Sequence, residues 1–306
     1  MEKILVITGV TATGKTDLSI ELAKRLDGEI VSADSMMVYR YMDIGTAKPS
    51  KEEMEEVPHH LIDVVDPSYD FSVKDFIELS QESIKDIVGR GKLPIVVGGT
   101  WLYIQSLLYG LTDAPEGDWK IREQLYRRDT EDLYNELQNV DREYAEKIHP
   151  NDKRRIVRAL EVYYISKKPF SYFINRHKFR ENRYDFVGFV LEREREELME
   201  RIEKRVDRMF EQGLVDEVRK LLDMGYENAI TSKQAIGYKE VLPYLEGEIS
   251  LEQAREEIIR NTKDFAKRQI RTFRSKFRDG EKWERLNISN YTNGELLYKI
   301  IEKYKS

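Results

Sequence analysis

The sequence predicts an α/β fold, in which a parallel sheet is flanked by helices and a helical insertion domain interrupts the chain. In the N-terminal part, short apolar runs alternate with amphipathic helical segments, the order typical of a parallel sheet. From about residue 112 to residue 182 the chain is charged and helical in pattern, with no run rich in β-branched residues. A further apolar run then returns. The segments before and after this insertion should therefore form one core domain.

The N-terminal part should contain three strands and two helices. The expected strands share short apolar runs of the kind buried in parallel sheets, and they cover residues 3–8, 28–34 and 92–100. The helices should cover residues 15–26 and 71–91, with the Ser72 hydroxyl as a cap of the second. One more strand is expected at residues 184–192, followed by amphipathic helices to about Phe277.

Length and composition limit the class of protein. With 306 residues the chain can bury one large core plus a smaller appended domain. We expect a core domain at 1–111 and 183–306, and a helical insertion domain at 112–182. No apolar run is long enough to span a membrane, and the absence of cysteine excludes disulfides and thiolate zinc sites. These features indicate a cytoplasmic protein, and we expect a monomer.

The segment GVTATGKT matches the pattern G-x-x-x-x-G-K-[ST] with Gly9, Gly14, Lys15 and Thr16. It follows a strand and opens a helix, which is the context of a P-loop, so the fold should be P-loop NTPase-like. Backbone N–H groups and the helix N-terminus form a cradle for phosphates, Lys15 adds a charge, and the Thr16 hydroxyl suits Mg²⁺. The candidate diphosphate-binding residues are Gly9, Thr11, Ala12, Thr13, Gly14, Lys15 and Thr16. This chemistry is not specific to ATP.

A carboxylate stands beside this loop. A P-loop kinase needs an acid, typically at the end of an apolar strand, to help hold Mg²⁺, but the strand LPIVV ends in Gly98-Gly99-Thr100. The strand EIVSA instead leads into Asp34. From the residues alone Asp34 is either a functional acid or a turn cap.

Seven segments together resemble one enzyme family. They are GVTATGKT, SADSMMVYRYMDIGTAKP, VPHHLID, VVGGTWLY, HPNDKRRIVRALEV, AIGYKE and AKRQIRTFR, and their order is similar to that in the tRNA dimethylallyltransferases (tRNA isopentenyltransferases). The resemblance runs from the first strand to about Arg274. Met37 departs from the glutamine that many members carry, and Lys263 and Phe273 depart from common family residues.

The resemblance implies transfer of a dimethylallyl group from dimethylallyl diphosphate to N6 of the adenine on the 3′ side of the tRNA anticodon, with Mg²⁺ as cofactor. It implies that Asp34 is the general base, which the weakly nucleophilic adenine amine requires. Arg158 and Thr100 match the other catalytic positions. The candidate tRNA-binding residues are Asp34, Ser35, Met36, Met37, Thr100, Arg122, Arg155, Arg158, Lys267, Arg271 and Arg274. The insertion domain is expected to clamp the anticodon stem-loop.

Two basic regions favour an RNA partner despite a net charge of −6. One lies between Lys153 and Arg183, interleaved with Tyr163, Tyr164, Phe170, Tyr172 and Phe173, which are either core residues or stacking platforms. On the helix around 259–278 one stripe carries Arg260, Lys263, Lys267, Arg271, Arg274 and Arg278, with Asp264 as the only acid counted on it.

Three other functions remain open from the residues. The main alternative is a P-loop kinase of nucleotides or small molecules, which shares the loop and the sheet. An isopentenyltransferase acting on free adenine nucleotides and an RNA-binding module with a vestigial P-loop are the others.

Overall fold

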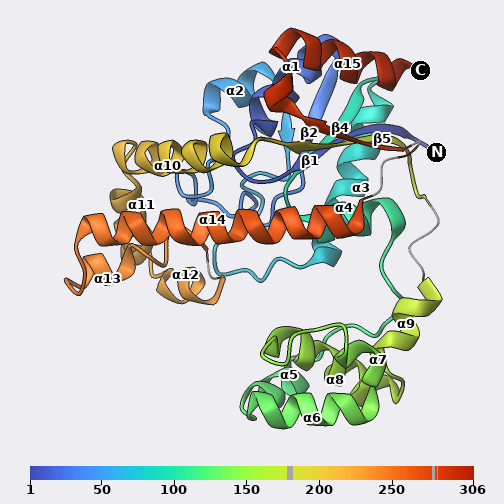
Figure 1. Cartoon of the computed structure of the whole chain (residues 1–306), viewed down its shortest axis with the longest axis vertical. Coiled ribbons are helices and arrows are strands. Elements are labelled where there is room, and N and C mark those ends of the chain that lie inside the picture. The colour runs from blue at the N-terminus through green and yellow to red at the C-terminus, as the bar shows by residue number, and fades with distance from the viewer. Residues whose placement is uncertain (178–181, 234, 278–279, 281) are drawn as a thin grey trace. The chain divides into compact units, whose positions relative to one another are not determined.

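One parallel sheet organises the larger part of the molecule, with strand order β3-β2-β4-β1-β5-β6 (Figure 1). The structure is a computed structural model that describes residues 1–177, 182–233, 235–277, 280 and 282–306. Its strands are β1 (Lys3–Gly9), β2 (Gly28–Ser32), β3 (His59–His60), β4 (Leu93–Gly98), β5 (Asp185–Glu192) and β6 (Trp283–Asn287). The α/β class with a P-loop-like sheet is confirmed.

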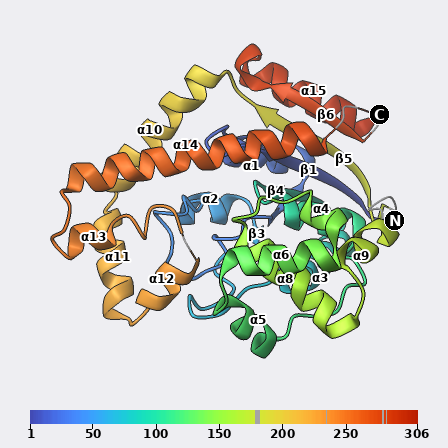
Figure 2. The same ribbon diagram turned by 60° about the horizontal axis from the view of Figure 1, so that its bottom comes forward.

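Helices make up most of the rest of this part of the chain. They are α1 (Lys15–Leu26), α2 (Lys51–Glu56), α3 (Val73–Gly89), α4 (Trp101–Tyr109), α10 (Arg195–Glu211), α11 (Leu214–Asp223), α12 (Glu227–Lys233), α13 (Leu242–Leu245), α14 (Leu251–Lys276) and α15 (Asn293–Lys305), with a short 3-10 turn at Ile288–Asn290. The Ser72 hydroxyl caps α3 by accepting from the Asp75 N–H at 3.2 Å, as the sequence predicts. Along the chain α10 and α14 are far apart, but in space they lie side by side (Figure 2).

One face of the sheet packs against α1 and α15. Its core contains Leu5, Ile95 and Phe189 from the strands, Leu22 from α1 and Ile300 from α15. A second apolar cluster joins the segment after β2 to α10 and α11, through residues such as Val38, Val206 and Val218. These two clusters fix the loops that follow β1 and β2.

Five of the described helices and strands escaped the sequence analysis, and one of them is α4, which directly follows the predicted strand at 92–100. β3 has only two residues and α2 only six, too few for a periodic pattern. β6 is the edge strand WERLN, in which two consecutive polar residues separate Trp283 from Leu286, so it contains no apolar run. The amphipathic helix α15 follows it. The second strand also stops at Ser32, so Asp34 lies in the loop beyond it.

The chain divides into two compact units, residues 1–108 with 183–306, and residues 109–182. The smaller one, called the helical unit below, contains α5 (Trp119–Tyr126), α6 (Thr130–Val140), α7 (Arg142–Ala145), α8 (Lys153–Ser166) and α9 (Phe170–His177). It has its own core, with Leu125, Leu133, Leu137 and Leu160 buried. Its first residue precedes the expected boundary at 112 because α4 ends there. No helix within the described residues combines the length and apolarity of a membrane span.

Candidate active site

The candidate site lies at the ends of four neighbouring strands of the sheet. β2, β4, β1 and β5 lie next to one another and are parallel, so their carboxyl ends meet at one edge, where α/β sheets bind ligands. The phosphate loop follows β1, Asp34 follows β2, Thr100 follows β4 and Arg193 follows β5. The topology therefore gathers residues that are widely separated in sequence.

The phosphate loop is closed by its own hydrogen bonds. Gly14, the residue before α1, has φ 97°, a left-handed conformation that disfavours other side chains. The buried Thr13 hydroxyl donates to the Val10 carbonyl at 2.8 Å. The Lys15 ammonium donates to the carbonyls of Gly9 and Val10 at 3.0 and 2.7 Å. The start of α1 and the lysine charge thus face the same small loop, which suits an anion.

Three arginines that the sequence analysis missed surround the loop. The Nε–H of Arg193 donates to the Thr13 carbonyl at 2.8 Å, and that of Arg201 donates to the Ala12 carbonyl at 2.9 Å. Arg205 donates through Nη1 to the Thr11 hydroxyl at 3.3 Å. The signal was present, because Arg193 directly follows a strand and the other two are four residues apart on one helix face. The many acidic residues around them obscured it.

Three basic side chains beside this loop have lowered pKa values. The pKa of Lys15 is lowered to about 7, mostly by burial and also by the positive charge of Arg205, while Asp34 partly offsets both. Burial also lowers the pKa of Arg205, against the effect of Asp34, and burial with the charge of Arg201 lowers the pKa of Arg193. Cations held this close repel one another, so a bound polyanion would relieve the repulsion.

Asp34 is fixed in place by the turn that follows it. Its Oδ1 accepts from the N–H groups of Met36 and Met37 at 2.8 and 3.2 Å. The Thr100 hydroxyl accepts from Ser35 N–H at 3.2 Å, and Thr100 N–H donates to the Ala33 carbonyl at 3.3 Å. Asp34 is therefore a turn cap. Its Oδ2 has no hydrogen-bond partner within the described residues and stays available, and its charge acts on Lys15 and Arg205.

Gln269 of α14 ties the phosphate loop to the end of β4. Its Oε1 accepts from Thr11 N–H at 2.8 Å, and its Nε2 donates to the Gly99 carbonyl at 3.2 Å. Gln269 is buried, and a buried amide needs such partners. The sequence analysis missed this residue, although a glutamine beside the apolar face of a helix was the available signal.

Glu217 of α11 holds the DIGTAKP loop. Its carboxylate accepts from the N–H groups of Asp43, Ile44 and Gly45 at 2.9–3.3 Å and from the Tyr238 hydroxyl at 2.6 Å. The same loop offers the Thr46 carbonyl to Arg205 Nη2 at 3.5 Å. Glu217 therefore fixes a loop that itself contacts one of the arginines around the phosphate site.

The cationic stripe of α14 is more neutralised than the sequence analysis expected. Lys263 pairs with Glu203 of α10, Arg260 pairs with Glu257 at 3.1 Å, and Lys267 pairs with Asp264 at 2.9 Å. The count of a single acid was too low because Glu203 belongs to the neighbouring helix α10 and Glu257 precedes the counted segment of α14. Within the described residues, the exposed Arg271 and Arg274 have no acidic partner. Arg278 lies outside the described residues.

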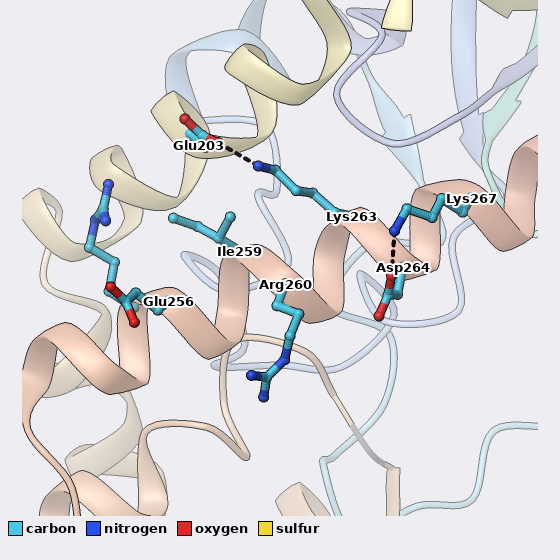
Figure 3. A pocket seen from close by; sticks show the side chains of 8 residues that line it. Glu203, Glu256, Ile259, Arg260, Lys263, Asp264 and Lys267 are labelled. Atoms are coloured by element: carbon cyan, nitrogen blue, oxygen red, sulfur yellow. Dashed lines mark hydrogen bonds and ion pairs between the residues drawn. The ribbon is translucent and has the colours of Figure 1, made fainter. Parts of the chain in front are cut away.

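A groove of about 420 Å³ lies between α10 and α14, lined by the paired half of this stripe (Figure 3). The side chains of Lys263 and Lys267 point to Glu203 and Asp264 there. No residue of the phosphate loop lines the groove. We therefore assign the chemistry to the strand ends and not to this groove.

The helical unit carries the remaining predicted residues. Arg122 and Arg158 pair with the buried carboxylate of Glu161, and Arg155, which is more exposed, pairs with Asp152 at 3.3 Å. The aromatic residues expected to be either core residues or stacking platforms differ in burial. Phe170 packs edge-to-face on Tyr144 against the core, whereas Tyr172 is 39% exposed with Lys168 over its ring.

The fold and the site identify the class of protein: it is a P-loop α/β protein in which three arginines contact the phosphate loop. Residues 37–276 match the IPP transferase family, and residues 2–64 match the isopentenyl transferases. The chain belongs to the IPP transferase family.

Named relatives agree with this assignment. A tRNA dimethylallyltransferase of a Sulfurihydrogenibium species is 62% identical over 98% of this chain and 97% of its own length. A solved structure from Staphylococcus epidermidis, a tRNA delta(2)-isopentenylpyrophosphate transferase, is 42% identical with a TM-score of 0.72 and covers 100% of this chain and 99% of its own. A eukaryotic dimethylallyltransferase acting on tRNA is 36% identical with a TM-score of 0.77, over 89% of this chain and 70% of its own. The expected family is confirmed.

Proposed function

We propose that this chain transfers a dimethylallyl group from dimethylallyl diphosphate to N6 of the adenine on the 3′ side of the tRNA anticodon. The observation that carries the proposal is the fixed carboxylate of Asp34 beside a phosphate loop with four cations, Lys15, Arg193, Arg201 and Arg205. The loop suits a diphosphate, and the carboxylate suits an amine that must lose a proton. The named relatives supply the substrate class.

In the proposed reaction the allylic C–O bond of the diphosphate breaks and a C–N bond to the adenine amine forms. The proton of the amine passes to Asp34, whose Oδ2 has no partner within the described residues. Pyrophosphate is the leaving group and lies in the phosphate loop. There, N–H groups and cations stabilise the negative charge that grows on its bridging oxygen. The Thr100 hydroxyl stabilises the turn that follows Asp34, because it accepts a hydrogen bond from Ser35 N–H at 3.2 Å.

Mg²⁺ fits this site by its chemistry. The Thr16 hydroxyl stands in the first turn of α1 beside Lys15, and a hard cation prefers hydroxyl, phosphate and water oxygens. When bound, the ion would neutralise diphosphate charge. Thr16 would hold it, together with the oxygens of the diphosphate itself.

The remaining predicted residues belong to the RNA side of the proposal. Ser35, Met36 and Met37 would line the path of the target base. Lys267, Arg271 and Arg274 of α14, with Arg122 and Arg155 of the helical unit, would contact the RNA backbone. The resemblance offered Arg158 both a catalytic and a tRNA-binding role, and we propose the tRNA-binding role because Glu161 and the Pro115 carbonyl hold its guanidinium within the helical unit. We further propose that the helical unit clamps the anticodon stem-loop and that the enzyme is cytoplasmic and monomeric, which fractionation and gel filtration test.

Nucleoside mass spectrometry tests the function. The protein is incubated with dimethylallyl diphosphate, Mg²⁺ and unmodified tRNA, and the digested RNA should contain N6-dimethylallyladenosine. Parallel reactions contain AMP in place of tRNA, or ATP in place of the prenyl donor. A prenylated nucleotide formed only from AMP would favour the sister activity, whereas ATP turnover without prenylated RNA would favour the kinase.

A further inference from the structure

A buried carboxylate fixes two arginines at the surface of the helical unit. Glu161 of α8 has a fully buried side chain, whereas the side chains of Arg122 and Arg158 are 35% and 29% exposed. Glu161 accepts from Arg122 Nη2 at 3.2 Å, from Arg158 Nη1 at 2.5 Å and from Asp118 N–H at 2.7 Å, and Arg122 Nε lies 2.8 Å from the same carboxylate as an ion pair. Every donor needed by this carboxylate is therefore supplied, and each guanidinium has one defined orientation.

The neighbouring turn is shaped to allow this arrangement. A Cβ on Gly117 would lie 2.5 Å from Arg122 Nη2 and 3.2 Å from Glu161 Oε1. The Pro115 carbonyl accepts from Arg158 Nη2 at 2.7 Å. Desolvating a carboxylate is costly, and buried ion pairs add little net stability compared with apolar packing. The network is therefore better explained by the fixed guanidinium groups than by the stability of the unit.

An exposed tryptophan stands beside these groups. Trp119, the first residue of α5, is 66% exposed. The Arg122 guanidinium lies 5.8 Å from the centroid of its ring, within the range of a cation–π contact. The indole therefore presents most of its surface to solvent next to a fixed positive charge, a combination that the core of the unit does not need.

We propose that Trp119, Arg122 and Arg158 form a subsite for one unpaired nucleotide of the RNA. The base stacks on the indole of Trp119, and the adjoining phosphate lies against the two guanidinium groups. Every base has a π face, so this subsite recognises that a nucleotide is unpaired and not which base it carries. Glu161 is a positioning residue. This inference rests on the proposed function, because it assumes an RNA substrate.

Trp119→Ala and Trp119→Phe test the stacking. Each full-length chain is titrated with an unmodified anticodon stem-loop RNA and with the same strand annealed to its complement. The matched control is Tyr298→Ala, because Tyr298 is 68% exposed on α15 of the other unit. Trp119→Ala should raise the Kd for the stem-loop at least about fivefold and leave the Kd for the duplex unchanged, with Trp119→Phe in between. The stem-loop should quench tryptophan fluorescence in the wild type but not in Trp119→Phe.

Equal stem-loop affinity of wild type and Trp119→Ala would overturn the subsite, and so would an equal loss of affinity for stem-loop and duplex. Failure of the proposed function looks different, because the wild type would then form no prenylated nucleoside whatever the Trp119 variants do. A chain that prenylates normally but shows no effect at Trp119 contradicts the subsite alone.

Glu161→Gln tests the positioning role. Glutamine keeps an acceptor but removes the charge that holds both arginines, so stem-loop affinity should fall and its salt dependence should change, with the rate of prenyl transfer at saturating RNA affected less. Gly117→Ala should have the same effect by displacing the Arg122 guanidinium, and it leaves Glu161 intact in case Glu161→Gln unfolds. Unchanged affinity and salt dependence in a folded Gly117→Ala would contradict the role of the fixed arginines.

Discussion

Asp34 combines a structural and a chemical task through its two oxygens. Oδ1 caps the turn that follows β2 by accepting from Met36 and Met37 N–H, while the charge of the carboxylate acts on Lys15 and Arg205. The two interpretations that the sequence left open, a turn cap and a functional acid, are therefore compatible. The cap orients the group that the proposed reaction needs.

Asp34→Asn separates these two tasks. Asparagine keeps a carbonyl oxygen for the turn but cannot accept a proton, so the rate of prenyl transfer should fall about 100- to 10,000-fold. Thermal unfolding should stay close to that of the wild type, and tRNA affinity should change only a few-fold. Transfer at the wild-type rate would remove Asp34 as the base.

Lys15 should couple diphosphate binding to proton uptake. Its pKa of about 7 in the free protein means that it is mostly neutral at pH 8, and a bound diphosphate should raise that pKa. Binding of dimethylallyl diphosphate at pH 8 should therefore take up close to one proton, and affinity should fall as the pH rises from 7 to 9. Calorimetry in buffers of different ionisation enthalpy measures this uptake, and Lys15→Met should abolish it.

At the scale of elements, two long helices add side chains to the site that the strand ends form. α10 brings Arg201 and Arg205 to the phosphate loop, and α14 brings Gln269 to the same loop. α14 also carries the exposed Arg271 and Arg274 on another of its faces. A helix that contacts the loop and presents cations to solvent can connect diphosphate binding with RNA binding.

Arg201→Ala should weaken binding of dimethylallyl diphosphate about tenfold or more, because a charge-assisted contact with the leaving group is lost. The matched control is Lys204→Ala on the same helix, since Lys204 is exposed and, among the described residues, pairs only with Glu200 at 3.9 Å. Steady-state kinetics with a varied prenyl donor make the comparison. Equal effects of the two variants would show that net charge, and not the position of Arg201, matters.

Arg271→Ala combined with Arg274→Ala should weaken tRNA binding and reduce the slope of log affinity against log salt by about two. Arg260→Ala combined with Lys263→Ala is the control on the same helix. Both control residues are already paired with acids, Glu257 and Glu203, so the slope should change less. A salt slope that is the same in the wild type and the first double variant would exclude this surface.

At the scale of the whole molecule, the chain builds two units with separate cores. The phosphate loop and the three arginines around it lie in the sheet unit, whereas Arg122, Arg155 and Arg158 lie in the helical unit. Damage to one core should therefore leave the other unit folded, which makes the contributions of the units separable by mutation.

Leu160→Ala tests this independence. Leu160 is fully buried in the helical unit, so the change should destabilise that unit by about 2–5 kcal/mol. Hydrogen exchange should become faster within residues 109–182 and stay slow in the sheet, and dimethylallyl diphosphate should still bind. Faster exchange throughout both units would contradict separate folding.

Local periodicity and short contiguous motifs were enough to predict the class of fold, the P-loop segment, Asp34 as its neighbour and the family. The sequence by itself did not reveal β6, whose polar edge residues lack an apolar run, nor Arg193, Arg201, Arg205 and Gln269 as neighbours of the loop. Nor did it reveal that Glu203 of α10 pairs with Lys263 of the α14 stripe. These contacts became visible in the folded structure, because pairing across a sheet and packing between helices bring together side chains that are far apart in the sequence.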